Sequence, residues 1–181
     1  MTRYAGRRAV VVGQSTGIGL AIAKRLVEGG AKVLLTAGSA REREHAKVEL
    51  GSAARVVAPD SVQSGLGPVG GIDLVFAGAA TSARPLLPYL TDGGAVVLTA
   101  PAPTPATVRA LAAELAARGI RVNAVAPNCI EAPAGGAAPL PPLGRLGSAE
   151  EVARAALFLA TDATFTTGAR LPVDGGLRHH P

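Results

Sequence analysis

Short runs of consecutive apolar residues recur along the chain, separated by longer stretches in which apolar residues return every three or four positions. The runs lack the alternation of a half-exposed strand, which is typical of strands that are covered on both faces. They predict strands at 9–12, 32–36, 55–58, 73–77, 95–99, 121–126 and 170–173. The periodic stretches predict helices at 17–30, 40–50, 104–118 and 148–160.

The order of these elements predicts the fold class. Strands and helices alternate, which favours a parallel, doubly wound sheet with right-handed crossovers. We therefore expect a Rossmann-like α/β fold with about seven strands. No repeat or low-complexity linker divides the chain, so residues 1–181 are expected to form a single domain. Ser148 stands three residues before Glu151, a spacing that predicts a capping box at the start of the last helix.

A glycine-rich loop, Gly13-Gln14-Ser15-Thr16-Gly17-Ile18-Gly19, lies between the first predicted strand and the first predicted helix. Glycine lacks a Cβ, so the backbone can take unusual φ values and approach a ligand closely. The helix that follows offers unpaired N–H groups and the positive end of its dipole to an anion. The loop therefore predicts a nucleotide ligand. The alternative is that Gly17 and Gly19 only permit close packing of the helix on the strand.

Composition and charge narrow the class of protein. The formal net charge is +5, but 15 of the 18 basic residues are Arg and they form no cluster, so we expect no nucleic-acid partner. Cys129 is the single cysteine, which fits a reducing compartment. No apolar run is long enough to span a bilayer. These observations predict a cytoplasmic protein with no membrane partner. No grouping of His, Cys, Asp and Glu has metal-ligand spacing, so we expect no metal site.

The motifs together resemble the short-chain dehydrogenase/reductase family, in the family's order and over most of the chain. Gly13-x-x-x-Gly17-x-Gly19 is similar to its cofactor loop. Further similar segments follow at 57–60, 118–127, 143–152 and 171–176. The resemblance implies an NAD(P) cofactor. It places the following residues at the cofactor: Gly13, Ser15, Thr16, Gly17, Ile18, Gly19, Asp60 and Gly78. Asp60 would contact the adenine, or else only cap the end of a strand.

The chain departs from the family pattern at the catalytic residues. The family uses a Tyr as acid/base, a Lys four residues later and a Ser. This sequence contains Tyr4, Tyr89 and three lysines, and no Tyr-x-x-x-Lys occurs. The family's Ser-Ser pair falls here at Ala100-Pro101, and Ala132 stands where the family often has a Thr near the nicotinamide. We therefore assign no catalytic residue.

The chain is also shortened in two places. The helices after the fourth and fifth strands are expected to be reduced or missing, because few residues separate Ala80 from the fifth strand and Thr99 from Thr104. The loss of cover predicts exposed apolar surface near Phe76, Leu86 and Leu87, which would offer a docking surface to a partner.

The sequence leaves NAD against NADP open. The segment 36–39, after the second strand, offers no carboxylate for a ribose 2′-OH, which argues against strict NAD preference. Arg41 and Arg43 would suit a 2′-phosphate, although the run 41–44 (Arg-Glu-Arg-Glu) is more typical of a solvated helix face.

Three functional hypotheses follow. The first is a nucleotide-binding protein without ordinary dehydrogenase activity, acting as a sensor, regulator or partner subunit. The second is an oxidoreductase or non-redox enzyme with a rewired site, for which the polar groups to test are Asn128, Glu131, Thr99, Thr104 and Tyr89. The third is a structural remnant with an empty cleft. The resemblance also implies a homodimer through the last helix and last strand, because the region 148–173 that carries this family interface is intact.

Overall fold

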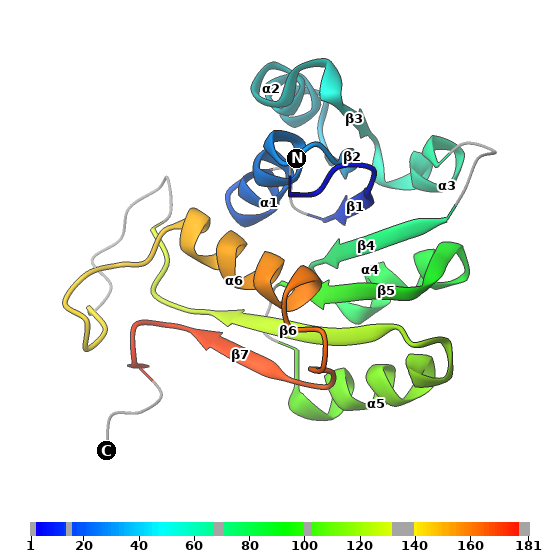
Figure 1. Cartoon of the computed structure of the whole chain (residues 1–181). Helices are drawn as coiled ribbons and strands as arrows, with labels where there is room; N and C mark the ends of the chain where they lie inside the picture. Colours follow the sequence, from blue (N-terminus) through cyan, green and yellow to red (C-terminus); the bar gives the residue numbers. More distant parts are fainter. Residues whose placement is uncertain (1–2, 14–15, 67–70, 100–102, 132–139, 178–181) are drawn as a thin grey trace.

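A computed structural model describes residues 3–13, 16–66, 71–99, 103–131 and 140–177. Seven parallel strands form one sheet in the order β3-β2-β1-β4-β5-β6-β7 (Figure 1). The strands are β1 (Arg8–Val12), β2 (Lys32–Thr36), β3 (Ala54–Val57), β4 (Ile72–Ala77), β5 (Leu90–Leu98), β6 (Arg121–Pro127) and β7 (Arg170–Val173). The strand order reverses between β1 and β4, which is where a doubly wound sheet opens a binding crevice. The predicted Rossmann-like class is confirmed.

The helices cover the sheet on both sides. The four long ones are α1 (Ile18–Glu28), α2 (Ala40–Leu50), α5 (Pro105–Leu115) and α6 (Ala149–Thr161). The short ones are α3 (Val62–Gly65) and α4 (Ala80–Ala83), with 3₁₀ turns at η1 (Gly51–Ala53), η2 (Pro59–Ser61), η3 (Arg84–Tyr89) and η4 (Ala116–Arg118). In Figure 1, α1 and α6 lie on one face of the sheet and α5 on the other.

Successive strand residues point into two separate cores. Val11, Leu35 and Phe76 pack on the face that α1, α2 and α6 cover, while Val10 and Val75 pack on the face of α5. Burial on both faces explains why the strands read as continuous apolar runs. The two cores fix the sheet and leave the carboxyl ends of the strands free to carry a site.

The reduction after the fourth strand is confirmed, but its expected consequence is wrong. Phe76, Leu86 and Leu87 are buried, not exposed. The segment between β4 and β5 folds as α4 and η3 against the sheet, and Leu86 and Leu87 pack into the core under α5. A single turn and a 3₁₀ segment therefore replace the cover of a longer helix.

Candidate functional site

A cavity of about 510 Å³ opens at the carboxyl ends of the strands, next to the glycine loop. Its walls come from the loop after β1, the end of β2, the segment after β3, the segment after β6 and the start of α6. The lining residues that the structure describes are Gly13, Thr16, Gly17, Ile18, Thr36, Gly38, Glu42, Pro59, Ile130, Glu131 and Ala149. The glycine loop, for which the sequence predicts a nucleotide ligand, forms part of the cavity wall.

The residue before α1 cannot cap the helix with a side chain. This residue is Gly17, with φ +55° and ψ −122°. By contrast, Ser39, Thr104 and Ser148 each accept a hydrogen bond from the first turn of α2, α5 and α6. The first turn of α1 holds no acidic residue. An anion in the cavity would meet the open, positive end of this helix.

The glycine loop is tied to its neighbouring strands by the backbone. Gly13 has φ +94°, and its N–H donates to Thr36 Oγ1 at 2.9 Å. Thr36 is 1% exposed, so this hydrogen bond is shielded. The N–H of Gly78 donates to the carbonyl of Val12 at 3.2 Å. A Cβ on Gly13 would lie 3.9 Å from that Gly78 nitrogen, so the loop runs close to the end of β4.

The predicted cofactor residues fall into three groups. Gly13, Thr16, Gly17 and Ile18 line the cavity. Gly19 is buried within α1, and Gly78 lies beside Gly13. Asp60 lies on an exposed turn, where it accepts a hydrogen bond from Ser61 Oγ at 3.1 Å. Its neighbour Pro59 lines the cavity. Ser15 lies outside the described residues, as do Ala100, Pro101 and Ala132. Contact of any of these residues with a cofactor stays a prediction.

Sequence reasoning missed Glu42. The segment 36–39 was expected to offer no carboxylate, yet Glu42, three residues further on, lines the cavity beside Thr36 and Gly38. Ser39 and Glu42 form a capping box that turns the glutamate back toward the end of β2. The Ser-x-x-Glu spacing of Ser39 and Glu42 was the signal in the sequence that could have predicted this capping box. The same spacing predicts the capping box of Ser148 and Glu151.

The polar groups proposed for a rewired reaction are not brought together. Only Glu131 lines the cavity. Thr99 is buried and donates to the carbonyl of Ala77, Thr104 caps α5, and Asn128 lies at a second cavity. Tyr89 precedes β5 and therefore lies at the amino ends of the strands, away from the glycine loop. No Tyr or Lys is among the described residues that line the cavity.

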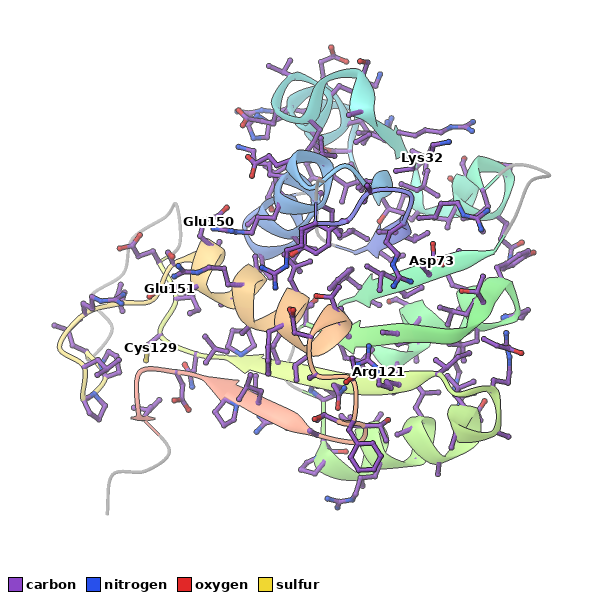
Figure 2. The ribbon with its side chains drawn as sticks, in the orientation of Figure 1. Lys32, Asp73, Arg121, Cys129, Glu150 and Glu151 are labelled. Atoms are coloured by element: carbon purple, nitrogen blue, oxygen red, sulfur yellow. The ribbon has the colours of Figure 1, made fainter. Side chains whose placement is uncertain are left out.

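The second cavity, of about 430 Å³, lies between the segment after β6 and the end of β7. Arg145 and Glu151 meet there at 2.7 Å, and this ion pair, with the backbone N–H of Ser148, lowers the pKa of Glu151 to about 2. Cys129, next to Asn128, has φ +51°. Figure 2 places Glu150, Glu151 and Cys129 at the same end of the molecule, and Lys32 at the far end.

In the described part of the chain, no group of three His, Cys, Asp or Glu residues is arranged to hold a metal ion. None of the helices in those residues has the length and apolarity needed to cross a membrane.

Comparison with known proteins agrees with this architecture. Residues 7–64 match the family model described as short chain dehydrogenase, and residues 91–178 match the one described as enoyl-(acyl carrier protein) reductase. The 3-oxoacyl-[acyl-carrier-protein] reductase FabG of Salmonella typhimurium is 31% identical, with 96% of this chain and 98% of that protein aligned. Cis-4-hydroxycyclohexanecarboxylate dehydrogenase of Sinomonas cyclohexanicum is 29% identical over 96% of this chain and 97% of that protein.

Solved structures show the same fold. A structure described as a putative betaketoacyl-ACP reductase superimposes with a TM-score of 0.79 at 27% identity, over 97% of this chain and 99% of that chain. A short-chain dehydrogenase/reductase from Serratia marcescens superimposes with a TM-score of 0.84 at 23% identity, over 97% and 99% of the two chains.

The fold and the glycine loop define a Rossmann-like protein with a crevice at the switch point of its sheet. The chain belongs to the short-chain dehydrogenase/reductase family, a family of oxidoreductases that generally bind NAD(P). The alignment with the Salmonella reductase spans 239 positions against the 181 residues of this chain, so the relative carries segments that this chain lacks.

Proposed function

We propose that this protein binds an NAD(P)-type dinucleotide in the cavity beside the glycine loop and does not carry out the ordinary dehydrogenase reaction of its family. The observation that carries the proposal is the start of α1, which has a glycine at its N-cap and borders a cavity of about 510 Å³. Gly13 and Gly17 hold positive φ there, so backbone lies where a bulkier residue would be strained. This arrangement fits the phosphates of a dinucleotide.

The proposed lack of ordinary activity rests on where the Tyr and Lys side chains lie relative to the cavity. A bound NAD(P) supplies hydride exchange, and the family pattern adds a Tyr, a Lys and a Ser to move the proton. Here Lys24 is paired with Glu49 and Lys47 with Glu44, both on the outside of the molecule. Tyr4 is buried against Gly29, at the end of α1 far from its start. A role as ligand sensor or partner subunit follows.

An enzyme with a rewired site is the second candidate, and Glu131 is the observation that favours it. Glu131 lines the cavity, after β6, and is a residue type that can serve as proton donor or acceptor for a bound substrate. The reductase names of the relatives agree with this alternative.

Binding and turnover separate these functions. We expect isothermal titration with NAD⁺ and with NADH to give saturable heats. We expect no sustained change in reduced-cofactor absorbance when 3-oxoacyl thioesters and simple ketones are added. Sustained turnover would refute the non-catalytic proposal and favour the rewired enzyme. If neither NAD(H) nor NADP(H) binds at millimolar concentration, the dinucleotide proposal fails and the structural remnant is favoured.

We further propose a homodimer formed through α6 and β7. Phe158 of α6 is half exposed and Phe165, between α6 and β7, is fully exposed. Within the described sheet β7 pairs only with β6, so its outer edge is open. An open strand edge beside exposed aromatic rings is a self-association surface that a second copy would cover.

Light scattering is expected to give twice the mass of the 18.0 kDa chain. Phe158→Glu would place a charge in the proposed interface and shift the protein to monomer. Val48→Glu, on the exposed face of α2, introduces the same charge elsewhere and is expected to leave the dimer intact. A monomeric or tetrameric wild-type protein would contradict this interface.

A further inference from the structure

A separate cavity of about 370 Å³ lies at the amino ends of β1 and β2, whereas the dinucleotide cavity lies at their carboxyl ends. Figure 2 shows Lys32, which lines this separate cavity, at the end of the molecule opposite Glu150 and Glu151. The helix α3 is a single turn, and its last residue, Gly65, also lines the cavity, so the cavity begins where this helix ends. A volume of this size is large enough for a small molecule.

The floor of this cavity is apolar. Val10 of β1 and Leu34 of β2 are paired in register, and both belong to the core on the α5 face of the sheet. Ile72 of β4 belongs to the same core, and Leu66, just after α3, packs against it. An apolar part of a ligand would therefore find an apolar wall at the sheet.

Two exposed cations stand beside this apolar floor. Arg55 of β3 is paired in register with Leu34, and Lys32 comes two residues before Leu34 in β2, so both point to the same face of the sheet as Leu34. The guanidinium of Arg55 donates through Nη1 to the carbonyl of Gly65 at 3.1 Å, which holds it at the α3 wall of the cavity. The sheet register thus combines apolar and positively charged side chains in one cavity.

The charge of the cavity wall has one sign. The described lining includes Arg8, Lys32 and Arg55, and it includes no Asp or Glu. Asp73 of β4 lines a different cavity, where Arg7 Nη1 lies 4.0 Å from its carboxylate. A wall with several cations and no carboxylate attracts an anion.

We propose that this cavity binds a small amphipathic anion, a molecule with an apolar body and one carboxylate or phosphate head group. The apolar body would lie against Val10, Leu34 and Ile72, and the head group would lie between Lys32 and Arg55. Arg and Lys both donate charge-assisted hydrogen bonds to such head groups. The proposal is independent of dinucleotide binding, because the two cavities share no lining residue.

Titration calorimetry with octanoate, kept below the concentration at which it forms micelles, tests the proposal. We expect saturable binding of one octanoate per chain. Octanol has the same apolar body without the charge, and acetate has the charge without the body, so each is expected to bind at least tenfold more weakly. Octyl phosphate distinguishes the two head groups, because the tighter of the two anions identifies the preferred one.

Charge reversal at the cavity tests the two cations. Lys32→Glu and Arg55→Glu are each expected to weaken octanoate binding at least tenfold. Arg109→Glu reverses a charge on an exposed position of α5 and is expected to leave the binding unchanged. Melting curves of the three variants, measured without ligand, check that the fold is retained.

Amide signals in NMR spectra of the labelled protein locate the ligand. Octanoate is expected to shift the signals of Leu34 and Leu66, and to leave those of Gly17 and Ile18, at the dinucleotide cavity, in place. The proposal is wrong if neither octanoate nor octyl phosphate binds at millimolar concentration, or if octanol binds as tightly as octanoate. It is also wrong if Lys32→Glu and Arg55→Glu bind like Arg109→Glu. None of these results would bear on the binding of NAD(P).

Discussion

Replacing Arg121 with methionine is expected to lower the free energy of unfolding by about 2–4 kcal/mol. Arg121 lies at the start of β6, and its guanidinium donates to two carbonyls in the last turn of α6 and to one just beyond the helix. The distances are 2.7 Å to Leu159, 2.5 Å to Ala160 and 3.0 Å to Ala163. Burial lowers the pKa of this guanidinium. Without it, the last carbonyls of α6 lose both their hydrogen bonds and a favourable positive charge.

Urea denaturation followed by circular dichroism would measure this effect. Arg154→Met, on an exposed position of α6, is the matched control and is expected to change stability by less than about 0.5 kcal/mol. Arg121→Lys is expected to recover only part of the loss, because one ammonium group does not reproduce the planar fork of a guanidinium. Equal stability of Arg121→Met and Arg154→Met would show that the helix end needs no such cap.

Gly17→Asp is expected to weaken dinucleotide binding at least 100-fold, or about 2.7 kcal/mol. The new carboxylate would stand at the start of α1, where we place the pyrophosphate and where Gly17 now has no side chain. It would satisfy the N–H groups of the first turn and repel the ligand at the same time. Titration calorimetry with NAD⁺ measures the loss.

Gly51→Asp is the matched control for backbone strain. Gly51 has φ +61° and ψ −155°, against +55° and −122° at Gly17, and a Cβ at either position meets nothing within 4 Å. Both substitutions therefore place Asp in a strained conformation and are expected to cost similar stability. Only the change at Gly17 is expected to affect binding. Loss of binding in both variants would point to a general effect on the fold.

Much of the fold was predictable because the sheet is covered on both faces. Buried strands such as β2 read as unbroken apolar runs, and their bounds were predicted correctly. The first half of β5 was missed because residues 91–94 are polar or glycine. Residues 91–94 are held in the strand by contacts with residues far away in the sequence, which a local pattern does not reveal. Thr91 Oγ1 donates to the carbonyl of Ile72, and Arg118 pairs with Asp92 at 2.9 Å.

The candidate site was predictable only in part. The glycine loop carries a local signal, because its backbone geometry requires glycine at Gly13 and Gly17. Glu42 was hidden in a run of alternating charges that is typical of a solvated helix face. Its direction depends on the capping box with Ser39, which the Ser-x-x-Glu spacing indicates but the pattern of charges does not. The same limit applies to Leu86 and Leu87, whose burial depends on how η3 turns back onto the sheet.

The walls of the cavity come from both ends of the chain. Gly13, Thr36 and Pro59 lie in the N-terminal half of the chain, at or just after the ends of β1, β2 and β3. Glu131, after β6, and Ala149, at the start of α6, lie in the C-terminal half. Arg25 of α1 and Glu150 of α6 join these halves at 2.5 Å. A ligand in the cavity would act as a clamp between them, and at 100 times its Kd would add about 2.7 kcal/mol to the stability of the whole chain. The lifetime of such a protein in the cell would then depend on the concentration of its nucleotide, even if the protein catalysed no reaction.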